Sequence, residues 1–360
     1  MAPRHEQAKA RLVDAIVRGD FAVGAFLPPV EELAPQLQHT QATVRQALVE
    51  LADDHIVRRI QGKGTQVVRL PRLGRVALLL ADDAHLNGLI AEPIYSALHG
   101  LGYDVEVVPF SRDPQTLAEH CTRLRAGSNK ADFLIALEPP LQRDGSSARY
   151  WEVVEQFPHR VYYALSPRSQ DPGGHWVSPD HTHAARQVVD HLLSLGHRRI
   201  AAPLPHSGYW EDEVGRTTQH LVEVAGGTFV PTPFLDRHPE QIEPTLIKNE
   251  VTAYWASLDH DAMFVMHRLL RHGIHVPEDF SVIGRNDTPW TGQCLSPLTT
   301  VSLNPPGVVQ AVTDAIQSLA NNGQHTRGST TLVKPELVVR GSTGPVRHVQ
   351  VERATVHVAE

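Results

Sequence analysis

Cysteine is scarce in this 360-residue chain. The two cysteines, Cys121 and Cys294, lie far apart and form no C-x-x-C pair, so nothing indicates a disulfide framework or a zinc knuckle. Long apolar runs are also lacking. No segment approaches the roughly 18 apolar residues that a membrane helix needs, and the first 20 residues lack the apolar stretch of a signal peptide. We therefore expect a soluble, cytoplasmic protein with no membrane partner.

Common catalytic motifs are missing too. The sequence contains no G-x-S-x-G elbow, no Gly-rich phosphate loop with its lysine and no H-E-x-x-H helix. His181 and His183 lie beside Asp180, but no third ligand follows at a convincing metal-site spacing. We expect no catalytic residue, no cofactor and no metal site.

Charged residues are unevenly distributed along the chain. Residues 1–75 carry 11 basic and 8 acidic side chains, whereas the remainder carries 22 basic and 32 acidic ones. The segment 58–75 holds six basic residues and no acidic one. A small basic end on an acidic body suggests that the first segment faces a polyanion, although a solvated basic linker is the alternative.

Residues 1–70 have the pattern of a small DNA-binding domain. Apolar residues at helical spacing predict a helix that ends near Gly19 and a second helix that starts near Pro28-Pro29. A third helix is predicted to start at Gln41, with Thr40 as its N-cap. The segment HIVRRIQGKGTQVV predicts two short strands around a turn at 62–64. Three helices followed by a basic hairpin predict a winged helix-turn-helix.

Three phrases in this segment, LPPVEELA (27–34), TVRQAL (43–48) and GKGT (62–65), resemble the DNA-binding domain of the GntR family in order and spacing. The resemblance implies that the third helix enters the major groove of an operator while the hairpin contacts the minor groove or the backbone. Glu31 and Gln41 stand where the family usually has arginines, and Pro35 lies within the second helix. The expected DNA-binding residues are Gln41, Thr43, Arg45, Gln46, Arg58, Arg59, Gly62, Lys63 and Gly64.

Beyond residue 75 the chain alternates between strand and helix patterns. This alternation predicts an α/β fold with parallel, doubly wound sheets in two successive lobes. Strands are expected over 75–81, 104–110, 132–138, 160–165, 175–177, 199–205, 252–256 and 280–286, and helices over 114–126, 149–156, 181–195, 212–225 and 260–272.

Four phrases of this body, AARQVVDHLLSLGHRRI (184–200), VPEDFSVIG (276–284), SPLTTV (296–301) and PELVVRGST (335–343), resemble regulators of the LacI/GalR family. That resemblance implies a periplasmic-binding-protein-like domain with a small molecule in the cleft between its lobes. We expect a DNA-binding domain over 1–70, a linker over 71–75, a two-lobed domain over 76–345 and a tail over 346–360. The first lobe is expected to hold about 76–165 and 291–325, and the second about 166–290 and 326–345.

The resemblance also places residues that could bind the small molecule. Arg186 matches a family arginine that often contacts the effector, Asp259 matches an aspartate of an Asn-Asp pair, and Asn286 stands where a ligand-binding aspartate is usual. Leu137 and Leu258 replace polar residues, which makes the expected cleft less polar than a standard sugar site. The expected ligand-binding residues are Asp82, Asn87, Arg186, Trp210, Asp259 and Asn286.

Together these patterns predict a transcriptional regulator, a repressor, whose affinity for double-stranded operator DNA changes when a carbohydrate-like effector binds. The family resemblance implies a homodimer formed through the body. Two alternatives stay open: a small-molecule-binding protein with a degenerate DNA-binding domain, and an enzyme built on the same α/β body.

Overall fold

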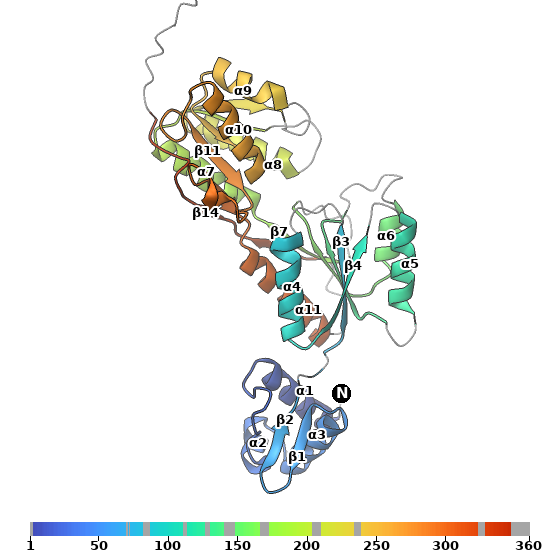
Figure 1. Ribbon diagram of the computed structural model, residues 1–360. Helices are drawn as coiled ribbons and strands as arrows, with labels where there is room; N and C mark the ends of the chain where they lie inside the picture. Colours follow the sequence, from blue (N-terminus) through green and yellow to red (C-terminus); the bar gives the residue numbers. More distant parts are fainter. Residues whose placement is uncertain are drawn as a thin grey trace, which may run out of the picture. The chain divides into compact units, whose positions relative to one another are not determined.

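The computed structural model of the protein describes residues 3–69, 71, 73–81, 87–110, 114–126, 130–139, 148–165, 173–203, 210–233, 239–322 and 328–346. Figure 1 shows its three parts: a small domain of helices with a hairpin, and two α/β portions of the body. Within the described residues, no helix is both long enough and apolar enough to cross a membrane.

The N-terminal domain consists of three helices and one hairpin. Its core combines the apolar face of each helix with the buried ends of the hairpin. Leu12, Leu33 and Leu51, one from each helix, are fully buried in this core. The second helix ends at Gln36, one residue after Pro35, so the missing backbone donor falls in the last turn, where it interrupts little. The elements are α1 (Arg4–Val17), α2 (Val30–Gln36), α3 (Gln41–Asp53), β1 (Val57–Ile60) and β2 (Gly64–Val67).

The first sheet of the body has the strand order β13-β7-β6-β5-β3-β4. Its central strand β5 is buried on both faces, as expected for a parallel sheet covered by helices. Figure 1 shows α4 and α11 on one face and α5 and α6 on the other. The elements are β3 (Arg75–Ala81), the π-helical turn Asn87–Ala91, α4 (Glu92–Gly100), β4 (Asp104–Phe110), α5 (Pro114–Arg125), β5 (Phe133–Leu137), α6 (Ala148–Val154), β6 (Arg160–Tyr163), β7 (His175–Pro179), α11 (Pro305–Asn322) and β13 (Thr330–Val333).

The second sheet has the order β14-β12-β11-β10-β8-β9, and all its neighbours are parallel except the pair β12 and β14. Side chains of α7 and α8 form the core on one face, and those of α9 and α10 form it on the other. The elements are α7 (His181–Ser194), β8 (Arg199–Pro203), α8 (Trp210–Val224), β9 (Thr228–Thr232), α9 (Pro239–Lys248), β10 (Ala253–Trp255), α10 (Asp259–Arg271), β11 (Ser281–Arg285), the 3-10 turn Thr291–Gln293, β12 (Thr299–Ser302) and β14 (Glu336–Val338).

The expected α/β class with parallel, doubly wound sheets is confirmed. The chain forms two compact units, one of residues 1–162, 171–175 and 312–328 and the other of 163–170, 176–311 and 329–360. This division differs from the expected lobes in its details. Residues 291–325 were expected in the first lobe, but β12 pairs with β11 and β14 in the second sheet. The two strands β7 and β13 pair with each other in the first sheet, although most of β7 and all of β13 fall in the second compact unit.

Candidate functional site

The first candidate site is the start of α3. Thr40 caps this helix as expected, because its hydroxyl accepts a hydrogen bond from the Thr43 amide at 3.3 Å. The two hydroxyls of Thr40 and Thr43 lie 2.8 Å apart and hydrogen-bond to each other. Gln41, Arg45 and Gln46 are exposed on the following turns, so the first turns of α3 present a polar surface to the surroundings.

Arg45 lies between two partners on this surface. Its guanidinium donates to the Gln41 side-chain oxygen at 3.4 Å and lies 3.6 Å from a carboxylate oxygen of Glu31 on α2. Both charged side chains are more than 60% exposed, so the pair is screened by solvent and stabilises the fold little. Glu31 therefore competes with any anion for Arg45.

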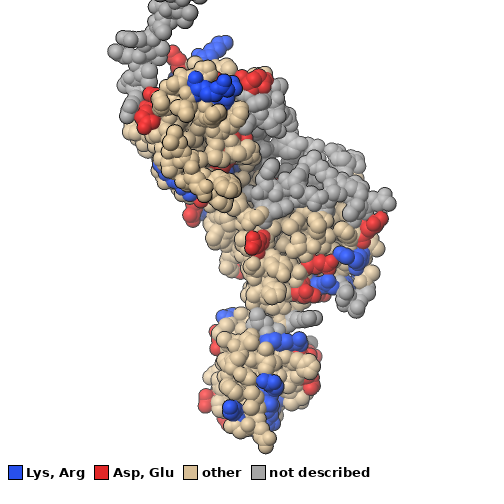
Figure 2. Space-filling view, viewed as in Figure 1, with Lys and Arg blue, Asp and Glu red and all other residues tan. Residues whose placement is uncertain are grey.

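The hairpin has the geometry of a wing. Strands β1 and β2 pair antiparallel, with Arg59 opposite Thr65. Gly62 and Gly64 have φ of 76° and 106°, conformations that glycine adopts without a steric penalty. Arg58, Arg59 and Lys63 are exposed, and Figure 2 shows basic side chains on the face of this domain that carries the hairpin. The nine residues expected to bind DNA therefore fall on two adjacent structural features, the start of α3 and the wing.

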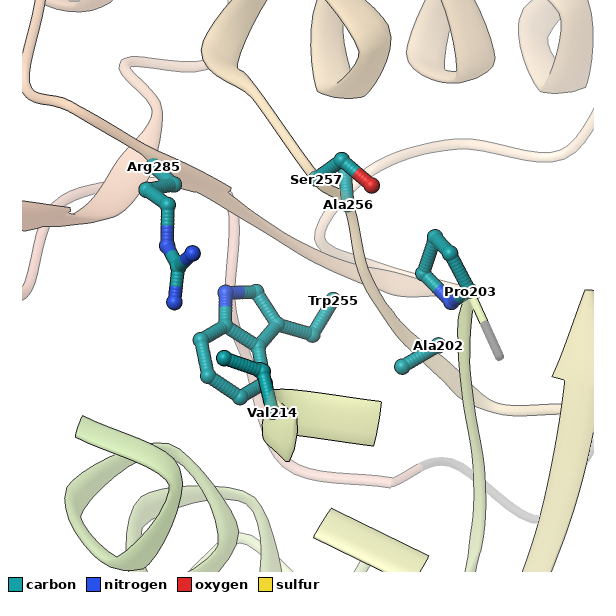
Figure 3. Close-up of a pocket in the computed structure, with 7 residues that line it drawn as sticks. All are labelled: Ala202, Pro203, Val214, Trp255, Ala256, Ser257 and Arg285. Carbon is teal, nitrogen blue, oxygen red and sulfur yellow. The ribbon is translucent and has the colours of Figure 1, made fainter. Parts of the chain in front are cut away.

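The second candidate site lies in the second sheet, where the strand order reverses. The chain passes from β8 outward to β9 and then back across to β10, so β8 and β10 are neighbours whose connecting helices lie on opposite faces. A crevice outside the carboxyl ends of two such strands is the general ligand position in open α/β sheets. A hollow occurs at this point, lined by Ala202, Pro203, Val214, Trp255, Ala256, Ser257 and Arg285 (Figure 3).

Arg285 is the charged group of this hollow. It ends β11, is only 1% exposed, and its guanidinium carbon lies 5.4 Å from the centre of the Trp255 ring, a cation–π arrangement. Its charge is felt by the first residue of α7: burial, and then the positive charge of Arg285, lower the pKa of His181 to about 3. The His181 ring contacts the Leu165 carbonyl oxygen, so this histidine is a neutral, buried residue of the fold.

The chain turns sharply after Arg285. Asn286 and Asp287 have φ of 96° and 52°, a region that non-glycine residues rarely adopt and that is often found at functional sites. Asp287 is held by Arg340, whose guanidinium donates to its carboxylate at 2.6 Å. Asn286 is 7% exposed, and its side-chain oxygen has no hydrogen-bond partner among the described residues. A buried acceptor without a donor marks Asn286 as a ligand-facing candidate.

Asp259 is hydrogen-bonded to this turn. It begins α10, is 1% exposed, and accepts hydrogen bonds from the Thr288 amide at 2.7 Å and the Thr300 hydroxyl at 2.5 Å. Burial raises the pKa of Asp259, and the hydrogen bonds from Thr288 and Thr300 oppose that rise. Both carboxylate oxygens are thus engaged within the domain, and the visible role of Asp259 is to fix the turn that carries Asn286.

The other expected ligand residues are less closely grouped. Arg186 is exposed on α7. Asp82 and the side chains of Asn87 and Trp210 lie outside the described residues. Leu137 ends β5 and is 2% exposed. Asp180, noted beside two histidines, accepts a hydrogen bond from the His183 amide and caps α7. Within the described ranges, no group of three or more His, Cys, Asp or Glu side chains is placed to hold a metal ion.

Two family models match the parts of the chain that hold these sites. Residues 4–67 match the model of bacterial regulatory proteins of the gntR family, and residues 189–343 match the periplasmic binding protein-like domain. The chain joins a GntR-type DNA-binding domain to a periplasmic-binding-protein-like domain. This is the domain content of a transcriptional regulator.

Similar proteins are named as transcriptional repressors or regulators. The arabinose metabolism transcriptional repressor of Geobacillus stearothermophilus is 25% identical over 95% of this chain and 98% of its own length. A LacI family regulator from Enterococcus faecium, solved with bound ribose, has 18% identity and a TM-score of 0.62 over 76% of this chain and all of its own. A Lac repressor dimer, solved on operator with an anti-inducer, has 20% identity and a TM-score of 0.62 over 76% of this chain and 95% of its own. The body therefore has the fold of LacI family regulators.

Trp255 and Arg285 were missed as site residues by sequence reasoning. The available signal was an arginine at the end of an otherwise uncharged, buried strand, SVIGR, which is an unusual position for a charge. Trp255 had no such signal, because a tryptophan in a buried strand is an ordinary core residue.

Gly284 tests how tightly Asp259 fixes the turn in the periplasmic-binding-protein-like domain. A Cβ at Gly284 would lie 2.4 Å from an Asp259 carboxylate oxygen and 2.8 Å from Leu298. We expect Gly284→Ala to lower the free energy of unfolding by about 1–3 kcal/mol, because overpacking of a filled core forces neighbours to shift. The measurement is urea denaturation followed by circular dichroism. Gly292→Ala is the control, since no atom lies within 4 Å of its Cβ position; equal stability of the two variants would contradict this packing.

His181 predicts a pH dependence of the same domain. Its pKa in the folded state, about 3, lies below the unfolded value near 6.5, so its contribution to stability is complete above pH 6.5 and declines as the pH falls toward 3. At pH 5 the decline amounts to about 2 kcal/mol. We expect His181→Gln to lose less stability than the wild type between pH 7.5 and pH 5 in urea titrations. His220→Gln, an exposed site on α8, should follow the wild type; parallel curves for His181→Gln would refute the assignment.

Proposed function

We propose that this chain is a transcriptional repressor that binds a DNA operator through its GntR-type domain and releases it when a sugar or sugar derivative binds its body. The observation that carries the proposal is the pairing of the two sites in one chain. One is a polar helix start beside a basic wing, and the other is a hollow at the strand-order reversal of a LacI-like fold. Of the alternatives, the domain content favours this non-enzymatic, cytoplasmic role.

The DNA side is supported by the arrangement of the exposed polar groups. In the proposed complex, the start of α3 enters the major groove, where Gln41, Arg45 and Gln46 contact base edges or phosphates. The cations Arg58, Arg59 and Lys63 of the wing contact the backbone or the minor groove. Glu31 reduces the net positive charge beside Arg45, so affinity depends less on salt than it would with a cation at that position.

The effector side is supported by the relatives. The Geobacillus relative is named for arabinose metabolism, and the Enterococcus structure holds ribose. By analogy, we propose that the hollow beside Trp255 and the turn at Asn286 form one wall of the effector site. Asp82, Asn87, Arg186, Trp210 and Asp259 remain proposed contributors to that site.

We further propose that the regulator acts as a homodimer formed through its body. The Lac repressor relative is a dimer on its operator. In this chain, an apolar groove borders α10 and is lined by Met263, Met266, Leu270, Cys294 and Leu295 among others. Leu295 is 94% exposed, and an exposed apolar patch of this kind is typical of protein interfaces. Two recognition helices would then meet an operator with two-fold symmetry.

The proposal is tested by fluorescence anisotropy with a labelled DNA fragment from upstream of the gene for this chain. We expect specific binding that exceeds binding to scrambled DNA, and a loss of affinity of roughly 5- to 150-fold at saturating effector, the range of typical allosteric coupling. Pentoses and hexoses, their phosphates and their acids form the effector panel. Equal affinity for operator and scrambled DNA would favour a binding protein with a degenerate DNA-binding domain. Unchanged operator affinity with a bound effector would exclude the release mechanism.

Arg45 and Glu31 give a paired test of the recognition helix. We expect Arg45→Ala to weaken operator binding by roughly 5- to 150-fold, because a direct contact to DNA is lost. Glu31→Gln should tighten it by about 2- to 5-fold, because a carboxylate that competes for Arg45 is removed. Lys248→Ala and Glu278→Gln, exposed sites on the body, are the charge-matched controls. Opposite or absent shifts would remove Arg45 from the interface.

A further inference from the structure

We propose that Gln41 selects an A·T base pair in the operator, because its side-chain amide binds the major-groove edge of the adenine. The inference rests on the proposed function, since it assumes that the start of α3 enters the major groove. It goes further by naming the base that the regulator recognises there and the side chain that recognises it.

The first argument is the position of Gln41. It is the first residue of α3, and its side chain is exposed. In helix-turn-helix domains, the N-terminal residues of the recognition helix contact base edges. The cap holds this turn in place: Thr40 accepts a hydrogen bond from the Thr43 amide, and the hydroxyls of Thr40 and Thr43 lie 2.8 Å apart and hydrogen-bond to each other. The first turn also has no acidic residue that would repel DNA.

The second argument is the orientation of the Gln41 amide. Arg45, one turn further along α3, donates to the Gln41 side-chain oxygen at 3.4 Å. Because a guanidinium has only donors, the amide oxygen and not the nitrogen faces Arg45. The amide nitrogen makes no hydrogen bond among the described residues. An amide oxygen has two lone pairs, so Gln41 keeps one acceptor site and its N–H donors for a base.

Adenine is the base that matches a donor beside an acceptor. Its major-groove edge has N7, which accepts a hydrogen bond, next to the N6 amino group, which donates one. The Gln41 amide can donate to N7 and accept from N6 in one bidentate contact. Guanine has two acceptors at this edge, N7 and O6, so the amide oxygen of Gln41 would face another acceptor. The same edge of guanine suits an arginine, which has donors alone.

The neighbouring polar side chains are less suited to the same contact. Arg45 lies 3.6 Å from a carboxylate oxygen of Glu31 and donates to Gln41, so the donors that would match guanine are partly occupied. The Gln46 amide nitrogen donates to a Glu50 carboxylate oxygen at 3.3 Å. Glu50 therefore places a negative charge beside Gln46, whereas the nearest charge to the Gln41 amide is the cation Arg45. An amide beside a cation approaches DNA more favourably than an amide beside a carboxylate.

The test uses double-stranded DNA with a random central segment. The full-length chain selects sites from this pool, the bound DNA is sequenced, and the selection is repeated with Gln41→Arg. The base pair at which the two selected sites differ is the one that residue 41 contacts, so the operator need not be known beforehand. We expect A·T at this position for the wild type and G·C for Gln41→Arg, because arginine donors match N7 and O6 of guanine.

Fluorescence anisotropy on the selected sites then measures the preference. Replacement of A·T by G·C at this position should weaken wild-type binding by about 5- to 150-fold, the range for one bidentate base contact. Gln41→Arg should reverse the preference, and Gln41→Ala should bind both sites with nearly equal affinity. Gln241→Arg is the control, because it makes the same change of charge at an exposed position of α9 in the body; it should keep the wild-type preference.

The outcomes separate this inference from the proposed function. A wild-type site without A·T at the differing position, or a site that Gln41→Arg leaves unchanged, would overturn the inference and leave the operator-binding function standing. If the wild-type chain selects no sequence at all, both fail together. If Gln41→Arg does not fold, selection with Gln41→Ala decides instead: the position whose preference disappears must be A·T in the wild-type site.

Discussion

The hydrogen-bonded, buried carboxylate of Asp259 is the interaction on which the proposed effector site depends. It starts α10 and accepts hydrogen bonds from the turn after β11 and from β12, so it joins three segments that meet at one edge of the sheet. Placing a carboxylate there is unfavourable without partners, and the raised pKa of Asp259 reflects that burial. Because both carboxylate oxygens accept hydrogen bonds, they hold the turn after β11 in place, and the residues on that turn have a fixed geometry.

That fixed turn explains the residues of the run GRND. Gly284 leaves room for the Asp259 carboxylate, and Asp287 is held by Arg340. Asn286, on the turn between them, forms part of the wall of the effector site in our proposal. Such sites hold their polar groups in advance, so that little ordering is needed when the ligand arrives.

Much of this architecture was predictable from the sequence, because the spacing of apolar residues and the turn-forming residues determine secondary structure locally. The alternation of strands and helices gave the α/β class, and Thr40 and Gly62 marked the helix start and the wing. The lobe boundaries were harder, because the pairing of β12 with β11 and β14 joins residues far apart in sequence. Trp255 was hidden for the same reason, because its contact with Arg285 joins two separate strands. Asp259 stays a predicted ligand residue, and no sequence pattern revealed its hydrogen bonds with Thr288 and Thr300.

The N-terminal domain and the second sheet of the body differ in how far their arginines are exposed to solvent. On α3, Arg45 is more than 60% exposed and lies near Glu31, so solvent screens its charge, and in the proposed complex a nearby carboxylate tunes its contribution to DNA affinity. In the second sheet, Arg285 is 1% exposed, and its charge adds to burial in lowering the pKa of His181. An exposed cation suits a polyanion that brings many phosphates, because each contact can be weak. A buried cation such as Arg285 acts instead on groups inside the domain, because little solvent screens its charge there.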